Sequence, residues 1–307
     1  MKNLFAYATL ICGLMFLCSC EKEEIKEEPA EEMVETSFDV KIPLESATKT
    51  VSMGESTDVV YFEVWDEDFA KRLFPYPGSE ENVAKVNGRN AQITLDLVKD
   101  QYYNLIFWAQ NRECGAYSWA DLKEIKVDYT KFTQDQKDVY DAFYKVEKIL
   151  ANGETKSIYL TRPFAQVNFG ASQMSSSLGQ VTLKGNWVEI SEVASGFNTV
   201  EGKGIKPVQK VKFSTKADFV EDRTIVVENQ TFNWVAMNYL LVSSTDVMVT
   251  AEFDTNFGKI THVVHNVPID KNHKTNIVGN LFTTGAKLKI IVKEDFVKPE
   301  IPPVEIY

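Results

Sequence analysis

Cysteine is scarce in this sequence, which excludes a fold held together by many disulfides. The chain has four cysteines in 307 residues, and three of them, Cys12, Cys18 and Cys20, lie within the first twenty positions. Only Cys114 lies farther along the chain. Because no base stands near Cys114 in the sequence, we interpret it as a partly buried thiol rather than a nucleophile.

Histidine is equally scarce. His262, His265 and His273 lie close together in the sequence. On a strand, however, residues 262 and 265 point to opposite faces, and no cysteine or carboxylate stands at ligand spacing beside them. We therefore expect structural or surface histidines, with no metal and no cofactor.

Catalytic motifs are also missing. The sequence has no G-x-S-x-G elbow and no phosphate-binding P-loop, and EGKGIKP departs from G-x-G-x-x-G at its last position. The acids Asp66, Glu67 and Asp68 lack the glycine and the spaced oxygen ligands of a calcium loop, so a solvated turn is expected there. The sequence does not predict an enzyme.

A hydrophobic run long enough to span a bilayer is absent. The apolar stretch Leu4–Leu17 follows Lys2 and is shorter than the roughly 20 residues that a spanning helix needs. A basic start, an apolar centre and a small residue before a cut site are typical of a secretory signal, here residues 1–19.

The sequence Leu17-Cys18-Ser19-Cys20 resembles a bacterial lipobox in which Cys20 is acylated and becomes the first residue. Cys18 fits this register less well, because Leu17 before it is not small. A cleaved signal without lipid is the alternative. If Cys20 carries lipid, Cys114 is left without a disulfide partner.

Positive charge is deficient. The net charge is −11, and residues 21–36 contribute −6 of it through eight glutamates against two lysines. Residues 20–36 are therefore expected to form a solvated acidic tether. Nucleic-acid binding is disfavoured, because phosphate recognition needs a basic footprint. A solvated strand face is the expected role of the nearest basic set, Lys206, Lys210, Lys212 and Lys216.

Period-two alternation of apolar residues dominates the rest and predicts a mainly β protein. The segment SFDVKIPL places Phe38, Val40, Ile42 and Leu44 on one face. Tyr102–Gln110 is apolar on both faces, so it is expected to be a central strand. Near the end, DVMVTAEF and KITHVVHNV flank a glycine-containing turn and predict a hairpin, and AKLKIIVKE predicts a late strand.

One helix is expected near the end of the first half. Thr133 and Gln136 form a capping box, and Asn152-Gly153 supplies a stop. The apolar residues at helical spacing are Val139, Phe143, Val146 and Leu150. Two successive β domains are expected, residues 37–155, with this helix near its end, and residues 156–292. An extended proline-containing tail, residues 293–307, is expected to follow. Pro163 indicates a bend or an edge at the start of the second domain.

The tryptophans could form a stacking platform for sugars. Trp65, Trp108 and Trp187 lie within strand patterns, where core packing is expected. The pattern does not decide the role of Trp119 or Trp234.

Three segments in this order behind a lipobox resemble the fimbrillin-like surface lipoproteins of Bacteroidales, the type V pilin group. They are YYNLIFWAQN (Tyr102–Asn111), LTRPFAQVNFG (Leu160–Gly170) and VPIDKNHKTNIVGNLFT (Val267–Thr283). The resemblance implies two Greek-key, transthyretin-like β-sandwich domains and a role in surface attachment or pilus assembly. In polymerising members, a protease cutting after arginine removes the first strand, and a strand of the next subunit takes its place.

This sequence departs from that pattern, because its first arginine is Arg72, beyond the first two expected strands. Lys49 is the candidate for cleavage by a lysine-specific protease, SFDVKIPL for the removed strand, and residues 287–307 for the donor strand. The departure favours a permanently anchored or accessory subunit.

We therefore expect a non-enzymatic, lipid-anchored protein of the outer membrane, exposed at the cell surface. Its expected partners are the membrane, other pilus subunits through strand exchange, and host or bacterial surface ligands. A surface lipoprotein that binds glycans for nutrient capture is the alternative function.

Overall fold

The computed structural model of the chain describes residues 31–43, 56–75, 82–132, 139–216, 224–241, 246–285 and 287–293. The described residues from Met33 onward belong to one compact unit. Of the other unit, residues 1–32, only Glu31 and Glu32 are described. The described chain is mainly β, as expected from its alternating apolar pattern.

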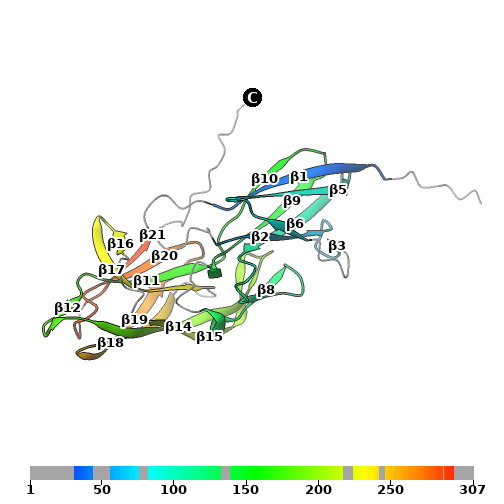
Figure 1. Ribbon diagram of the computed structural model, residues 1–307. Helices are drawn as coiled ribbons and strands as arrows, with labels where there is room; N and C mark the ends of the chain where they lie inside the picture. Colours follow the sequence, from blue (N-terminus) through cyan, green and yellow to red (C-terminus); the bar gives the residue numbers. More distant parts are fainter. Residues whose placement is uncertain are drawn as a thin grey trace, which may run out of the picture. The chain divides into compact units, whose positions relative to one another are not determined.

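Two sheets share the first core. In one, β1 (Met33–Lys41) lies between β10 (Lys156–Tyr159) and β5 (Asn90–Val98) (Figure 1). The other contains β3 (Arg72–Phe74), β2 (Val59–Trp65), β6 (Tyr102–Gln110) and β9 (Ala142–Leu150), in that order, and β4 (Val83–Lys85) also pairs with β2. Buried side chains of both sheets pack in one cluster, in which the rings of Phe38 and Phe107 lie 6.0 Å apart.

Two further sheets share the second core. The first has the order β19 (Gly258–Pro268), β18 (Asp246–Thr255), β14 (Leu183–Asn198), β8 (Glu124–Val127) and β7 (Tyr117–Ser118), and β15 (Lys203–Lys216) pairs with β14. The second has the order β16 (Thr224–Val227), β17 (Gln230–Leu240), β11 (Ala165–Ala171), β20 (Lys274–Gly279) and β21 (Lys289–Lys293). The remaining elements are β12 (Ser175–Ser176), β13 (Gly179–Gln180) and the 3-10 turn η1 (Tyr129–Lys131).

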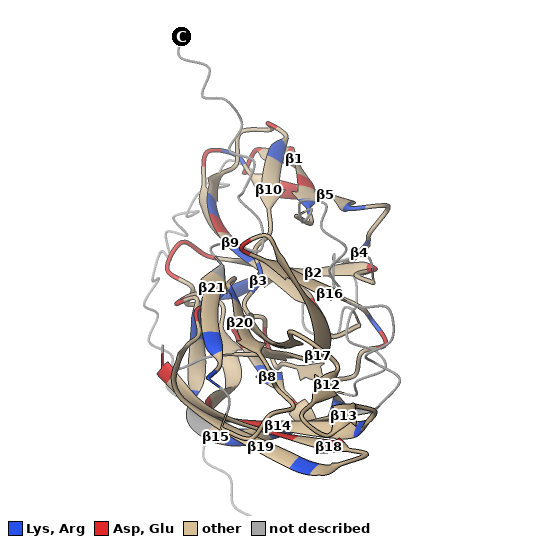
Figure 2. Cartoon of the chain, turned by 90° about the vertical axis from the view of Figure 1, so that its left-hand side faces the viewer, with Lys and Arg blue, Asp and Glu red and all other residues tan. Residues whose placement is uncertain are grey.

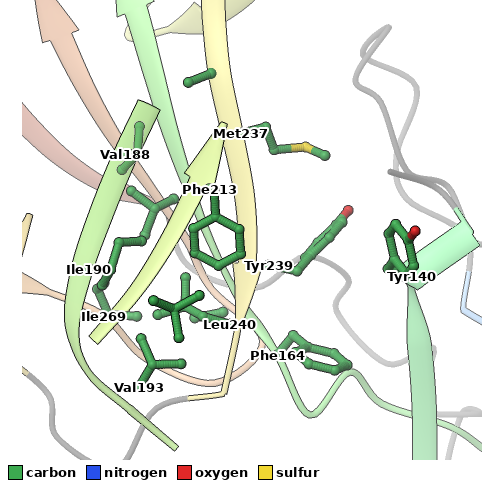
Figure 3. Packing of buried hydrophobic residues seen from close by; sticks show 14 of the residues in the cluster. Tyr140, Phe164, Val188, Ile190, Val193, Phe213, Met237, Tyr239, Leu240 and Ile269 are labelled. Carbon is green, nitrogen blue, oxygen red and sulfur yellow. The ribbon is translucent and has the colours of Figure 1, made fainter. Parts of the chain in front are cut away.

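The second core is built mainly from aliphatic and aromatic side chains of facing strands. In Figure 3, Val188, Ile190 and Val193 of β14 lie near Phe213 of β15 and Leu240 of β17. All five belong to one buried cluster. Close packing of this kind fixes the sheet that carries the turn between β14 and β15.

Strand β6 is central, as its sequence predicts. It pairs with β2 on one side and with β9 on the other. Leu105 and Phe107 are buried in the first core, whereas Ile106 and Trp108 are buried in the second. The prediction of two apolar faces is therefore confirmed, and β6 connects the two cores.

The expected helix is wrong over residues 142–150, which form strand β9. Every residue of β9 is in register with β6, from Ala142 opposite Gln110 to Leu150 opposite Tyr102. Thr133 and Gln136, the expected capping box, lie outside the described residues. Short apolar segments satisfy both helical and strand spacing, and here the ladder to β6 decides between them.

Strand β1 begins at Met33, before the expected end of the tether at residue 36. Phe38, Val40 and Ile42 are buried on one face as predicted, and Leu44 lies outside the described residues. The expected hairpin is confirmed by β18 and β19, and the late strand by β21.

Strand pairings cross residue 155 in both directions. Strand β10 follows this position yet pairs with β1, and β8 precedes it yet pairs with β14. Pro163 lies between β10 and β11, where the chain passes from one sheet to another, in keeping with the bend expected there. The division into two Greek-key domains stays a prediction.

Candidate functional site

A hollow with a volume of about 730 Å³ lies in the described part of the chain. Three segments line it: the loop after β2, the segment from β7 to β8, and the turn between β14 and β15. The lining residues are Phe69, Ser118, Trp119, Ala120, Asp121, Lys123, Glu124, Lys126, Asn198, Val200 and Glu201. Its volume falls within the range that is typical of sites for small molecules.

Trp119 is a half-buried aromatic residue of this hollow. Its ring system and the ring of Tyr61 pack edge to face, with the ring centroids 5.0 Å apart and the planes at 67°. This contact holds the indole in one orientation. Trp65, Trp108 and Trp234 are instead buried in the core.

Phe69, the second aromatic lining residue, has a φ of +58°. A bulky residue in this left-handed region carries about 1–2 kcal/mol of strain. The surrounding loop maintains it, because the carboxylate of Asp66 accepts bonds from the backbone N–H groups of Ala70 and Lys71 at 2.7 and 2.9 Å. The acidic run at Asp66 is therefore a turn, as its sequence predicts.

The buried carboxylate of Glu63 connects strand β2 to the segment that lines the hollow. Glu63 is 1% exposed and accepts bonds from Trp65 Nε1 at 3.0 Å, the Arg72 guanidinium at 2.9 Å and the Leu122 backbone N–H at 3.0 Å. Burial raises the pKa of Glu63, and these three bonds oppose the shift. Since Leu122 follows Asp121, this network fixes the segment that carries Trp119.

The turn between β14 and β15 is held against the same segment. Thr199 Oγ1 donates to the Leu122 carbonyl oxygen at 2.7 Å, and the Thr199 backbone N–H donates to Lys123 at 2.9 Å. A Cβ on Gly196 would lie only 2.5 Å from the Ile125 carbonyl oxygen, so glycine permits this approach. Contacts between segments far apart in the sequence therefore hold the walls of the hollow together.

The lining can bind a polar ligand with a flat apolar face. Asp121, Glu124 and Glu201 supply acceptors, and Lys123 and Lys126 supply donors. The Asn198 carboxamide oxygen accepts from the Glu201 backbone N–H at 2.9 Å, so its NH₂ group is oriented by the turn. An aromatic ring with such groups suits a polyhydroxylated molecule, whose C–H face packs on the ring while its hydroxyls are hydrogen bonded. Charged residues of both signs are also interspersed over the described strands (Figure 2).

The structure separates the three histidines. His262 is 7% exposed, and its Nε2 lies 2.7 Å from the Leu281 carbonyl oxygen, whereas His265 is exposed and His273 half-buried. Within the described ranges, no group of three His, Cys, Asp or Glu residues could hold a metal ion. Cys114 is buried, and burial raises the pKa of its thiol, so it is protonated at neutral pH.

The two modification sites expected from the sequence, Cys20 and Lys49, lie outside the described residues. Sequence reasoning left Trp119 undecided and missed the role of Phe69 and of the turn at Asn198–Glu201. The glycine pair in EGKG was the only local signal of a turn at this place. The contact that holds the turn could not be predicted locally, because it joins residues more than seventy positions apart.

A family model matches residues 28–305, most of the chain. Its description is a family of unknown function, DUF6562. The chain belongs to this family.

The DUF6562 fold is similar to several solved structures. A proposed cell adhesion protein from Bacteroides uniformis matches with a TM-score of 0.51 and 14% identity, over 86% of this chain and 99% of that one. Another from Bacteroides ovatus matches with a TM-score of 0.50 and 13% identity, over 88% and 99%. A third, from Bacteroides eggerthii, has a TM-score of 0.51 and 8% identity, over 85% and 96%. At such identities, the likeness shows the fold alone.

No curated protein matches this DUF6562 chain significantly. In the part of the chain that the structure describes, no helix has the length and apolar character needed to cross a membrane.

Proposed function

We propose that this protein is a non-enzymatic, fimbrillin-like lipoprotein of the outer membrane that acts in cell adhesion or as an anchored, accessory pilus subunit. Cys20 carries the lipid, and the acidic tether after it connects the lipid to the folded part of the chain. The solved structures with this fold include proposed cell adhesion proteins of Bacteroides, which supports an adhesion role.

The position of β1 is the observation that carries the proposal. All nine residues of β1 are in register with β5, and four of them with β10, so the strand is paired on both sides. Phe38 and Val40 are 0% exposed. Strand β1 follows the acidic segment directly and is part of the core. As long as β1 stays paired, a lipid at the N-terminus would therefore stay attached to the folded protein.

The strand is also poorly placed for removal at an arginine. Arg72 is the first arginine of the chain, and it lies beyond β1 in β3 with its guanidinium bonded to buried Glu63. Strand exchange with another pilus subunit would need cleavage at Lys49 and a donor from residues 287–307. In this chain β21, within that donor segment, already pairs with β20.

The lipid anchor is tested by comparing Cys20→Ala with Cys18→Ala in cells fed a labelled fatty acid. We expect Cys20→Ala to abolish labelling and to release the protein from membranes, because several acyl chains are needed for stable anchoring. Cys18→Ala removes a neighbouring sulfur and should leave both the labelling and the membrane attachment unchanged. Persistent labelling of Cys20→Ala would place the lipid elsewhere and refute this register.

Glycan capture is the second candidate function, and the hollow at Trp119 favours it. A half-buried indole beside oriented amide and carboxylate groups is a suitable platform for a sugar ring. Trp187 provides a matched control, because it is also half-buried but lies under Lys212, whose Nζ is 3.8 Å from its ring centroid. Binding on a glycan panel should be lost in Trp119→Ala and kept in Trp187→Ala, and no binding by the wild type would exclude this function.

A further inference from the structure

A second, smaller hollow of about 300 Å³ lies beside the turn between β14 and β15. Three lysines, Lys203, Lys206 and Lys271, line it without any acidic residue. The other lining residues are Pro163, Phe197, Gly202 and Gly204. This concentration of positive charge is unusual for a chain with a net charge of −11.

Lys271 is held in place at the hollow. Its Nζ donates to the Tyr144 hydroxyl at 2.7 Å and to the Gly202 carbonyl oxygen at 3.1 Å. An ammonium group has three N–H donors, and these two contacts, within the described residues, use two of them. This leaves the third N–H donor of the half-buried Lys271 side chain for a ligand.

Lys203 and Lys206 are exposed and make no ion pair within the described residues. Farther along the same strand, Lys210 lies 3.6 Å from the Glu189 carboxylate and Lys212 lies over Trp187. Lysines along an edge strand often serve only to prevent pairing with another chain. That role explains why the Lys203 and Lys206 side chains are exposed. It does not explain why these two lysines, which have no described ion-pair partner, both line the hollow.

Gly202 keeps the hollow open. Its φ is +65°, and a Cβ at this position would lie 3.1 Å from both Lys271 Nζ and the Tyr144 hydroxyl. A side chain here would be strained and would crowd the ammonium group. The turn sequence therefore preserves access to Lys271.

We propose that this hollow binds a compact anion, namely a carboxylate, sulfate or phosphate group. Three lysines that line the same hollow as Pro163 and Phe197 place positive charge around a small volume, which raises the local concentration of anions. The hollow at Trp119 differs, because its lining mixes acids and bases. This binding site depends neither on the lipid anchor nor on the function of that larger hollow.

Calorimetric titration of the full-length mature protein at low ionic strength tests the proposal. The probes are glucuronate, its neutral counterpart glucose, inorganic sulfate and inorganic phosphate. We expect the anions to bind and glucose not to bind, and we expect added salt to weaken binding. Tighter binding of glucuronate than of the inorganic ions would assign the site to sugar-borne carboxylates, and the reverse order to free anions.

Variants on one strand separate the site from general charge effects. Lys203→Ala with Lys206→Ala should raise the Kd of the bound anion at least tenfold, because hydrogen bonds to charged groups are among the stronger ones. Lys210→Ala lies on the same strand outside the hollow and should change the Kd less than twofold. Failure of every anion to bind, binding of glucose as tight as that of glucuronate, or equal weakening by Lys210→Ala would overturn the proposal.

Discussion

Arg162 and Asp141 form an ion pair with neither side chain exposed to solvent. Arg162 Nε lies 2.8 and 3.0 Å from the two carboxylate oxygens, and a terminal guanidinium nitrogen lies 2.7 Å from one of them. The guanidinium also lies 4.7 Å from the centroid of the Phe143 ring. Since Asp141 precedes β9 and Arg162 lies between β10 and β11, the pair fixes the chain where it passes between sheets.

Removal of one partner of this pair should be strongly destabilising. Arg162→Met or Asp141→Leu alone leaves an uncompensated buried charge and should lower the free energy of unfolding by about 3–5 kcal/mol. The double variant should recover most of this loss, because an apolar pair of similar volume replaces both charges. Urea denaturation of the four proteins measures the coupling between the two sites.

An exposed ion pair serves as the comparison. Lys148 and Glu67 lie 2.6 Å apart, with side chains 49% and 55% exposed. Lys148→Ala should therefore change the free energy of unfolding by less than about 1 kcal/mol. Equal effects at the two pairs would contradict the importance assigned to burial.

Glu63 should make stability depend on pH. Burial raises its pKa above the ordinary value of 4.5, so the folded protein holds this proton more tightly than the unfolded chain does. Its contribution to the free energy of unfolding therefore falls as the pH rises from 4.5 through the raised pKa. In Glu63→Gln this fall should disappear from urea midpoints measured between about pH 4 and pH 7. An unchanged slope in Glu63→Gln would refute the assignment.

Strand β1 should contribute heavily to the stability of the fold. Phe38 is fully buried against Phe107, so Phe38→Ala should lower the free energy of unfolding by about 3–5 kcal/mol. Phe257 is 42% exposed in the turn between β18 and β19, and Phe257→Ala should have a much smaller effect. If both variants unfolded at the same urea concentration, β1 would be dispensable to the core.

Local patterns predicted the strands best where burial is regular. The alternation in β1, β18 and β19 and the two apolar faces of β6 follow directly from which sheet faces are buried. Strand β9 was misread as a helix, because Phe143, Val146 and Leu150 also have helical spacing and the deciding ladder to β6 is a long-range contact.

The candidate sites were less visible in the sequence. The strand pattern does not decide the role of Trp119, and the left-handed backbone of Phe69 has no local sequence signature. The turn at Asn198–Gly202 reaches Leu122 and Lys271 only after the sheets have formed. Sites of this kind depend on contacts between distant segments, which periodicity and composition do not encode.

The mass of the N-terminal peptide of the mature protein, released from intact cells, tests the central claim most directly. We predict a peptide that begins at acylated Cys20 and continues into β1, because the first strand is retained with its anchor. A mature N-terminus near Thr50 would mean that β1 has been removed, and it would contradict the permanently anchored subunit proposed here.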